Sequence, residues 1–323
     1  MEDLRTVEAQ IASLVKTRDK ILAGMADENK KLTNDSSLAV CDGMKNFTCV
    51  KKLEVDKDTV VCYQGVPGVY SQQAMFRFFG KEIQNINVPD FGDVIEMVKN
   101  GKADYGVLPI ENSSAGFVNG IYDMVGNNDV TIVGEEVHVA HALMGVPGSD
   151  LSRIKTVYSH TQGLLQCTNY LSRKPWKQCS VANTAVAAVK VIEEGDKTQA
   201  AIASELAAEL YGLQILAKDI VNNDNNTTRF IILSKQKIFV EKAENISIRF
   251  SLPDESGTLY NILSHINLNG INMTSIESRP LTGRKWEYAF FVTMEGSLLD
   301  SRTRHALQGI CEDAMDFRLI GTY

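Results

Sequence analysis

The stretch TVVCYQGVPGVYSQQAMFRFFG, residues 59–80, indicates the fold most clearly. Residues 59–63 are an apolar run typical of a strand, and residues 71–79, closed by Gly80, have the pattern of a helix. The turn between them contains glycines, which let the backbone approach a ligand, and Ser71 is a candidate helix cap. A strand, a glycine-containing turn and a helix in this order indicate an α/β protein.

The alternation of short apolar strands and helical segments continues to residue 236. It predicts strands at residues 105–110, 155–159 and 200–203, and helices at residues 91–100, 161–171 and 184–194 with a further one ending at Tyr211. Such alternation predicts helices that cover a largely parallel sheet. The segment is long enough for one large domain or for two lobes.

After residue 244 the elements follow a different order. Strand, helix, strand, strand, helix and strand are predicted at residues 245–252, 257–267, 271–278, 286–294, 299–311 and 316–322. The order βαββαβ is the ferredoxin-like plan, which indicates a separate domain.

The N-terminal residues form a third region. Apolar side chains at three- and four-residue steps predict an amphipathic helix within residues 2–32, through Leu4, Val7, Ile11, Leu14, Ile21 and Met25. Residues 33–57 resemble an irregular linker. We therefore predict a helix and linker at residues 1–57, an α/β domain at residues 58–237 and a ferredoxin-like domain at residues 245–323.

The composition limits the class of protein. The chain of 323 residues is 44% hydrophobic and 23% charged, which is typical of a soluble globular protein. The net charge of −7 and the lack of a basic stripe argue against nucleic-acid binding. The chain has no run of about 18 uncharged apolar residues, as a membrane span requires. The N-terminus lacks the pattern of a secretory signal, so we expect a cytoplasmic protein.

The cysteines and the known motifs suggest neither a metal site nor a cofactor. Six cysteines are scattered without a CxxC pair, and we expect small buried side chains instead of a disulfide scaffold or a zinc site. The motifs GxGxxG, GxSxG and HExxH are absent, and so is a Walker loop. We expect no cofactor and no metal.

Polar side chains collect at five places where a predicted strand or turn ends, and ligands bind at such places in open α/β sheets. Each group also has a simple alternative as a capped helix or a polar loop. The candidates are Ser71 in the first turn; Glu111, Asn112 and Ser113 in the second; His160 and Gln162, with Gln166 one helical turn later, in the third; Thr184 in the fourth; and Thr228, Arg229 and Phe230 in the fifth. His138 and His141 lie in an apolar stretch and are predicted as core residues.

Taken in order, QGVPGVYS, PIENSSAG, SHTQGLLQC, NTAVAA and NNTTRFIIL resemble the signature blocks of prephenate dehydratases. ESGTLYNIL and INMTSIESRP resemble the two phenylalanine-site motifs of the ACT regulatory domain of that family. The resemblance implies a two-lobed catalytic domain like the type 2 periplasmic binding proteins, followed by an ACT domain. It implies a cytoplasmic homodimer or homotetramer that converts prephenate to phenylpyruvate under the control of L-phenylalanine.

The resemblance also implies roles for single residues. Thr228 resembles the catalytic threonine, which donates a hydrogen bond to the departing ring hydroxyl. The residues implied in substrate binding are Ser71, Glu111, Asn112, Ser113, His160, Gln162, Thr184, Arg229 and Phe230. Those implied in effector binding are Gly257, Leu259, Asn272, Glu277, Ser278 and Arg279.

Three questions stay open at the level of sequence. The first helix resembles the opening helix of a fused chorismate mutase, but Leu22 stands where a second active-site arginine would fall, so we expect a remnant or an oligomerisation helix. Arogenate dehydratase uses the same scaffold and is the nearest alternative activity. A non-catalytic amino-acid sensor is an alternative of another class, and the pair Thr228 and Arg229 argues against it.

Overall fold

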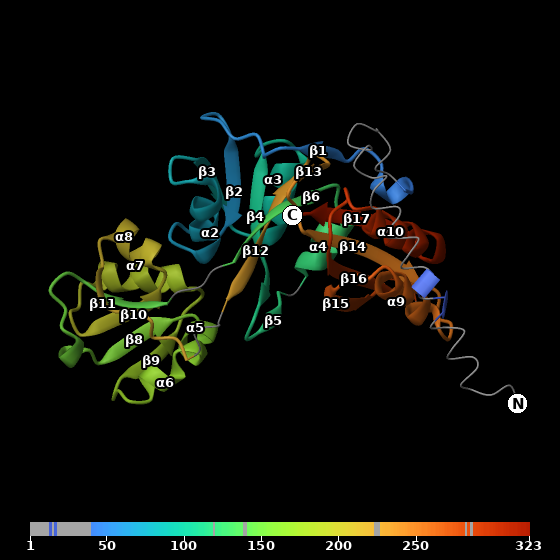
Figure 1. The fold of residues 1–323 in the computed structure, drawn as a ribbon. Coiled ribbons are helices and arrows are strands. Elements are labelled where there is room, and N and C mark those ends of the chain that lie inside the picture. The colour runs from blue at the N-terminus through green and yellow to red at the C-terminus, as the bar shows by residue number, and fades with distance from the viewer. Residues whose placement is uncertain are drawn as a thin grey trace, which may run out of the picture. The chain divides into compact units, whose positions relative to one another are not determined.

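The structure is a computed structural model that describes residues 13, 14, 16, 17, 40–118, 120–137, 141–222, 227–281, 283, 284 and 287–323. The chain divides into two compact units, residues 54–236 and residues 1–53 with 237–323 (Figure 1). Most of the predicted N-terminal helix, and with it the predicted chorismate-mutase-like remnant, lies outside the described residues.

The unit of residues 54–236 begins with a mixed sheet. Its strands lie in the order β3-β2-β4-β12-β6. Strand β2 runs parallel to β3 and β4, whereas β12 runs antiparallel to both β4 and β6. The bounds are β2 (Val60–Gln64), β3 (Gln84–Val88), β4 (Tyr105–Asn112), β6 (Thr131–Val137) and β12 (Thr228–Ser234), and the short β5 (Gly116–Phe117) pairs with β4.

A second sheet in the same unit repeats this arrangement. Its order is β9-β8-β10-β7-β11, with β8 parallel to β9 and β10 and with β7 antiparallel to β10 and β11. The bounds are β7 (Ala142–Gly145), β8 (Thr156–Ser159), β9 (Lys177–Ser180), β10 (Gln199–Ala203) and β11 (Gln214–Ala217). In each sheet the antiparallel strand is reached by a crossing of the chain, from β6 to β7 and from β11 to β12. The predicted α/β class and two lobes are confirmed, but both sheets are mixed where a largely parallel sheet was predicted.

Helices cover the two sheets and close their cores. The second sheet has α7 and α8 on one side and α5 and α6 on the other (Figure 1). Small side chains such as Ala187 and Ala207 let α7 and α8 pack closely, while Trp176 and Leu171 fill the opposite side. The bounds are α2 (Tyr70–Phe79), α3 (Phe91–Lys99), α4 (Ile121–Asn127), α5 (Thr161–Gln166), α6 (Thr168–Leu171), α7 (Thr184–Glu194) and α8 (Glu205–Tyr211).

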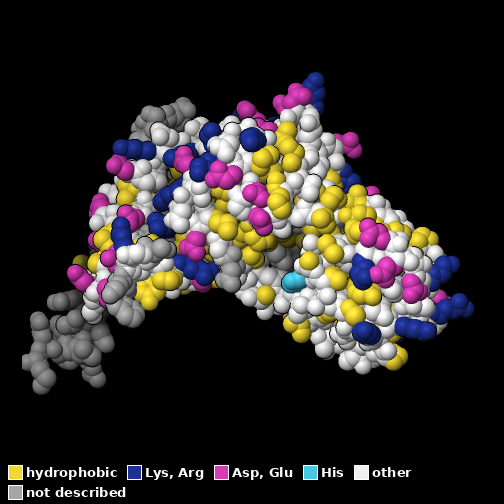
Figure 2. All heavy atoms as spheres, turned by 180° about the vertical axis from the view of Figure 1, so that it is seen from behind, with side chains coloured by type: hydrophobic (Ala, Val, Ile, Leu, Met, Phe, Trp, Pro, Cys, Tyr) yellow, Lys and Arg dark blue, Asp and Glu magenta, His cyan; other side chains and the backbone are white. Residues whose placement is uncertain are grey.

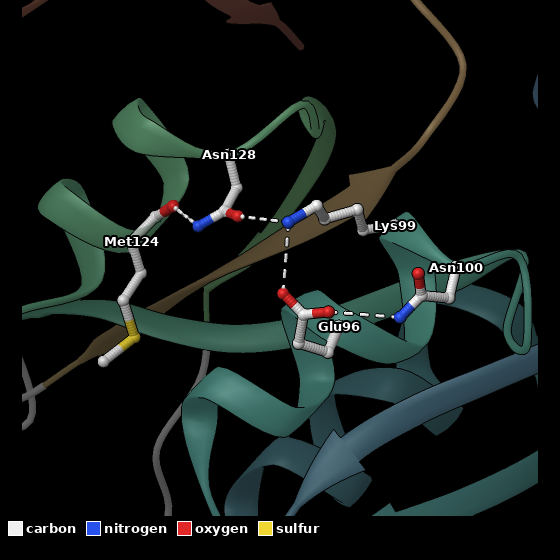
Figure 3. A network of polar contacts seen from close by, with 5 residues as sticks. All are labelled: Glu96, Lys99, Asn100, Met124 and Asn128. Carbon is white, nitrogen blue, oxygen red and sulfur yellow. Dashed lines mark hydrogen bonds and ion pairs between the residues drawn. The ribbon is translucent and has the colours of Figure 1, made fainter.

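A polar network ties α4 to α3 beside the first sheet (Figure 3). Lys99 Nζ donates to Asn128 Oδ1 at 3.1 Å and to Glu96 Oε1 at 3.2 Å. Asn128 Nδ2 donates to the carbonyl of Met124 at 2.9 Å, and Asn100 Nδ2 donates to Glu96 Oε2 at 3.1 Å. The C-terminal ends of both helices are thus joined by side chains that also satisfy exposed carbonyls. The network thus fixes α4, which follows β4 and β5 in the chain.

The other unit contains the predicted βαββαβ order. The antiparallel sheet has the order β15-β16-β14-β17, with α9 and α10 packed on one face through Ile248, Phe250, Val292 and Ile262. The bounds are β14 (Asn245–Leu252), α9 (Thr258–Leu268), β15 (Met273–Pro280), β16 (Tyr288–Glu295), α10 (Ser301–Asp313) and β17 (Met315–Thr322). A ferredoxin-like plan therefore follows the α/β unit, as predicted.

Part of the predicted linker is ordered within this unit. Residues 40–53 carry a 3-10 turn, η2 (Asp42–Met44), and a strand, β1 (Thr48–Val50), which pairs in parallel with β13 (Ile238–Val240). Met44 is 1% exposed and belongs to the same core as Phe250. The prediction of an irregular linker is therefore wrong for these residues, because a short strand among polar residues has little sequence signal.

The cysteine prediction is also wrong for one pair. Cys41 and Cys311 form a disulfide, with Cα atoms 6.6 Å apart and a separation of 270 positions in the sequence. Cys62 and Cys167 are buried free thiols, as expected. Because the two bonded cysteines lie at opposite ends of the chain and have no motif around them, spacing does not reveal their pairing.

On the face shown in Figure 2, acidic and basic side chains are interspersed and form no large basic area. Among the described residues, no helix has both the length and the apolar character that crossing a bilayer requires.

Candidate active site

The first element of the candidate site is the contact between the end of β4 and the start of β12. Asn112 Nδ2 donates to Thr228 Oγ1 at 2.9 Å and to the carbonyl of Thr227 at 3.2 Å. Asn112 Oδ1 accepts from the backbone N–H groups of Ser114 and Ala115, both at 3.0 Å. These two donors fix the orientation of the amide, so the NH₂ group must face Thr228. Thr228 Oγ1 is therefore an acceptor toward Asn112, and its own hydrogen is directed elsewhere.

The loop after β4 also fixes the start of β12. Ser113 N–H donates to the carbonyl of Thr227 at 2.9 Å, and Thr227 N–H donates to Ser113 Oγ at 2.9 Å. Strand β4 continues through Glu111 and Asn112, where a polar turn was predicted. The residues predicted from PIENSSAG therefore lie at the strand end and its first turn, where Asn112 contacts Thr228 and Ser113 contacts Thr227.

A chain of partly buried side chains, with the buried His141 among them, extends from Asn112 toward the second sheet. Gln166, the last residue of α5, lies with its Nε2 3.5 Å from Asn112 Oδ1 and its Oε1 2.7 Å from His141 Nε2. His141 Nδ1 in turn contacts the hydroxyl of Tyr70, the first residue of α2. These contacts bring together α2, β4, α5, β12 and the residue before β7. Thr228 is thus connected to both lobes of its unit.

Burial controls the protonation of this chain. His141 is 4% exposed, and burial lowers its pKa below the ordinary value, although the hydrogen bond to Gln166 acts in the opposite direction. Burial likewise raises the pKa of Tyr70 well above its ordinary value. His141 and Tyr70 are therefore both neutral near pH 7. His141 was predicted as a core residue, and it is buried as predicted. Its polar contacts were not predicted. Gln166 was noted one helical turn after Gln162 but was not among the predicted site residues.

The start of α2 lies in a closely packed loop. Gly68 has φ +89°, and a side chain there would meet Ala207 and Tyr211 of α8. Ser204 Oγ donates to the carbonyl of Gly68 at 2.7 Å, and Tyr211 donates to the carbonyl of Pro67 at 2.6 Å. The glycine loop is therefore held by the second lobe.

The prediction that Ser71 caps α2 is wrong. The capping position belongs to Val69, and no side chain caps this helix, while Ser71 is the second helical residue and is 5% exposed. The apolar side chain of the N-cap residue Val69 thus gives the first-turn N–H groups no cap. Such groups favour an anion, because the helix dipole adds a partial positive charge there.

The start of α7 differs from that of α2. Asn183 caps it through Oδ1, which accepts from the N–H of Val186 at 2.8 Å. Thr184 is the first helical residue, 8% exposed, and lies against Gly163 of α5. In α5 the cap is His160, which is exposed and whose Nδ1 accepts from the N–H of Gln162 at 3.3 Å. Three residues predicted for substrate binding thus lie at helix starts of the second lobe.

Arg229 points away from Thr228. Neighbouring residues of a strand face opposite sides of the sheet, and the contacts agree with this rule. Arg229 Nη1 lies 3.4 Å from Glu111 Oε2, and Arg229 Nε lies 3.3 Å from Glu135 Oε2 of β6. The predicted carboxylate clamp is therefore occupied by two glutamates of the protein itself. Burial raises the pKa of Glu135, Arg229 lowers it by a smaller amount, and Glu111 raises it again.

Phe230, on the face of Thr228, is 2% exposed and fills the core beneath it. Its buried ring packs inside the protein and stabilises the strand. Phe230 is therefore a core residue, unlike the polar residues with which it was predicted to bind the substrate.

The predicted effector residues lie on both faces of the sheet β15-β16-β14-β17 and on α9. Gly257 caps α9 with φ +91°, and Leu259 is the second residue of that helix. On strand β15, Ser278 is exposed and pairs with Phe290, whose ring packs against the core under α9. Glu277 and Arg279 stand on either side of Ser278 in the strand and face the other side of the sheet. There Arg279 Nη2 lies 3.4 Å from Glu277 Oε1. Asn272 lies exposed just before β15.

A cavity of about 390 Å³ lies at the opposite end of the first sheet from Thr228. It is lined in part by Glu54, Asp56, Asp58, Asp104 and Lys235, where β2 and β4 begin and β12 ends. Carboxylates predominate there, and they repel an anion. The cavity therefore does not suit a dianionic substrate.

A family model and two relatives name one family for this chain. Residues 61–238 match the family model described as prephenate dehydratase. The bifunctional chorismate mutase/prephenate dehydratase of Neisseria gonorrhoeae is 33% identical over 306 residues, which cover 94% of this chain and 84% of that protein. The chloroplastic arogenate dehydratase/prephenate dehydratase 1 of Arabidopsis thaliana is 34% identical over 329 residues, covering 96% and 83%.

A solved structure extends the similarity to the fold. The prephenate dehydratase of Arthrobacter aurescens, in complex with L-Phe, is 29% identical and has a TM-score of 0.76. The alignment covers 82% of this chain and 89% of that one.

Proposed function

The chain belongs to the prephenate dehydratase family, and from this premise we propose that it converts prephenate to phenylpyruvate, carbon dioxide and water at the start of β12. The observation that carries the proposal is the hydrogen bond from Asn112 to Thr228, because it leaves the Thr228 hydroxyl as a donor toward a ligand. A donor at that point is what the departure of a ring hydroxyl requires.

The reaction needs little energy from the protein, because the product ring is aromatic. The bond between the ring and its carboxylate breaks, and the electron pair moves into the ring as carbon dioxide leaves. The bond from the ring to the hydroxyl breaks at the far carbon, and the leaving hydroxide takes up a proton to become water. Thr228 donates a hydrogen bond to that oxygen as its negative charge develops.

The substrate is a dianion, and the protein must hold both carboxylates. The N–H groups at the start of α2 carry no side-chain cap and suit one of them. We assign the second carboxylate to the start of α7, with the N–H and hydroxyl of Thr184. His160 and Gln162, at the start of α5, are proposed to line the same site. The roles of Ser71, Thr184, His160 and Gln162 remain predictions.

Effector control is the second part of the proposal. The Arthrobacter aurescens structure contains L-Phe, and we propose that L-phenylalanine binds the ACT domain here near Gly257, Leu259 and Ser278. A coupling of about 1–3 kcal/mol between the sites would be sufficient for inhibition. A homodimer or homotetramer stays a prediction. A cytoplasmic location does too, and a Cys41–Cys311 disulfide would need an oxidising environment, because cytosolic thiols are normally kept reduced.

The experiment that tests the activity compares two substrates. The purified full chain is given prephenate or arogenate, and phenylpyruvate and phenylalanine are measured as end products. We expect phenylpyruvate to form faster. The arogenate activity named for the Arabidopsis relative is the alternative, and faster formation of phenylalanine would favour it. Phenylalanine binding in calorimetry without either product would favour a non-catalytic sensor.

A further inference from the structure

We propose that Tyr70 and His141 are positioning residues for the dehydratase reaction, which act through Gln166 and Asn112 to set the direction of the Thr228 hydroxyl. The proposal rests on the proposed function. Four hydrogen bonds join Tyr70 and His141 to Thr228 in one continuous chain, through Gln166 and Asn112.

The direction of every bond in the chain follows from its Asn112 end. Asn112 Oδ1 is fixed as an acceptor by the N–H groups of Ser114 and Ala115. The group that Gln166 presents to it must then be its NH₂, so Gln166 Oε1 faces His141. His141 must carry its proton on Nε2 to donate to that oxygen.

The same reasoning determines the role of Tyr70. A neutral imidazole with its proton on Nε2 has Nδ1 as an acceptor. The Tyr70 hydroxyl, which contacts Nδ1, is therefore the donor. Donors and acceptors now run head to tail from Tyr70 to Thr228, and the last free donor is the Thr228 hydrogen.

A head-to-tail chain strengthens its own bonds, because each hydroxyl or amide that accepts a hydrogen bond becomes a better donor. The other tautomer of His141 would reverse this order. With the proton on Nδ1, Nε2 accepts, and the Gln166 amide turns so that its oxygen faces Asn112 Oδ1. Two acceptors would then oppose each other at 3.5 Å. The hydrogen bond from Gln166 to Asn112 would be lost, and with it the support that the chain gives to the contact between Asn112 and Thr228.

Burial makes the chain specific enough for this role. His141 is 4% exposed, so bulk water does not compete for its ring nitrogens. Burying a hydroxyl or an imidazole without a hydrogen-bond partner raises the free energy of the folded state. This explains why Tyr70 and His141 are paired, but it does not explain why the chain of pairs leads to Thr228. The experiment must therefore separate positioning from simple satisfaction of buried groups.

Steady-state kinetics on prephenate with the full chain provides the first readout. We expect His141→Leu to lower kcat about 10- to 100-fold with KM within about twofold, and His141→Gln, which keeps an N–H donor, to recover part of the loss. Tyr70→Phe removes only one hydroxyl and should lower kcat less. Tyr63→Phe is the matched control, because Tyr63 is 1% exposed and lies in β2, in the sheet that contains β12. This variant should leave kcat unchanged.

A double-mutant cycle provides the second readout. If His141 acts through Thr228, His141→Leu should cost almost nothing once Thr228 is replaced by Ala. An equal loss in both backgrounds would overturn the proposal, and so would a rise in KM with kcat unchanged. A wild-type chain without activity on prephenate or arogenate would instead reject the proposed function.

The tautomer of His141 is the third readout and needs no activity. Nitrogen NMR of the labelled chain, assigned by the signals lost in His141→Gln, should show a proton on Nε2 and none on Nδ1. In Tyr70→Phe the two tautomers should mix. A proton on Nδ1 in the wild type, or an imidazolium, would contradict the inference whatever the kinetics show. This readout also serves if His141→Leu fails to fold.

Discussion

At the start of β12, Thr228 accepts a hydrogen bond from Asn112 and keeps its own hydrogen for another partner. Thr228→Ala removes that donor and little else, because the side chain is half-buried at a strand end. We expect kcat on prephenate to fall about 10²–10⁴-fold with KM nearly unchanged. Thr228→Ser keeps the hydroxyl and should retain most of the activity. Unchanged turnover in the alanine variant would remove Thr228 from the mechanism.

Single residues also show what the sequence can and cannot predict about the site. The order of motifs located Asn112, Ser113 and Thr228 correctly at one point of the fold. Arg229 was assigned to the same pocket, although strand alternation alone places it on the opposite face from its neighbour Thr228. His141 gives no signal, since a histidine in an apolar run has the same sequence whether it packs inertly or joins a polar chain.

Among the elements, the ends of β4, β6 and β12 are tied together by Arg229 between Glu111 and Glu135. We expect Arg229→Gln to reduce the free energy of unfolding by about 1 kcal/mol, because two partly exposed carboxylates are left facing each other. Denaturant unfolding of the variant and of Arg229→Gln/Glu135→Gln should show recovery in the double variant. An effect confined to the KM for prephenate would indicate the predicted clamp instead.

The contribution of Glu135, beside Arg229, to the stability of the fold depends on pH, and the sign of this dependence is known. The pKa of Glu135 is raised in the folded protein, so near that pKa the folded state binds more protons than the unfolded state. Its contribution therefore becomes less favourable as the pH rises through the folded pKa. In Arg229→Gln the opposing charge is gone, so the loss of stability should be larger at pH 8 than at pH 5.

The elements α9 and β15 allow a sharper version of the effector prediction. Gly257, Leu259 and Ser278 belong to the face that carries α9, whereas Glu277 faces the other side. We expect Ser278→Ala to raise the phenylalanine concentration for half-inhibition about tenfold, with basal kcat unchanged. Glu277→Gln should leave inhibition as it is. The reverse result in the same assay would move the effector site to the opposite face.

At the scale of the whole molecule, the Cys41–Cys311 disulfide closes a loop of 270 residues. Loss of a disulfide commonly costs about 2–5 kcal/mol of stability. We expect reduction, or Cys311→Ser, to lower the denaturation midpoint of the unit that contains residues 237–323. Cys179→Ser, at a free cysteine, is the control. A thiol assay on the unfolded chain should find four thiols before reduction and six after it. Equal midpoints with and without reductant would contradict the prediction.

The sequence predicts local features of the molecule better than long-range ones. Helices such as α3 and α7 were placed within a residue or so, because apolar periodicity and end signals are local. The positions of β7 and β12 within their sheets were not predicted, since they depend on pairings between segments far apart in the chain. The β1–β13 pair and the disulfide were not predicted either, because each joins segments far apart in the chain.

The return of the chain to the first sheet at β12, after β7 to β11 have formed the second sheet, has a consequence for fragments of the protein. A piece that ends after β6 lacks β12, so β4 and β6 would have no strand between them. Residues 142–217, by contrast, contain every strand of the second sheet, from β7 to β11. A single cut of the gene between β6 and β7 therefore leaves the first sheet without β12, so the N-terminal piece should be recovered only when the rest of the chain is expressed with it.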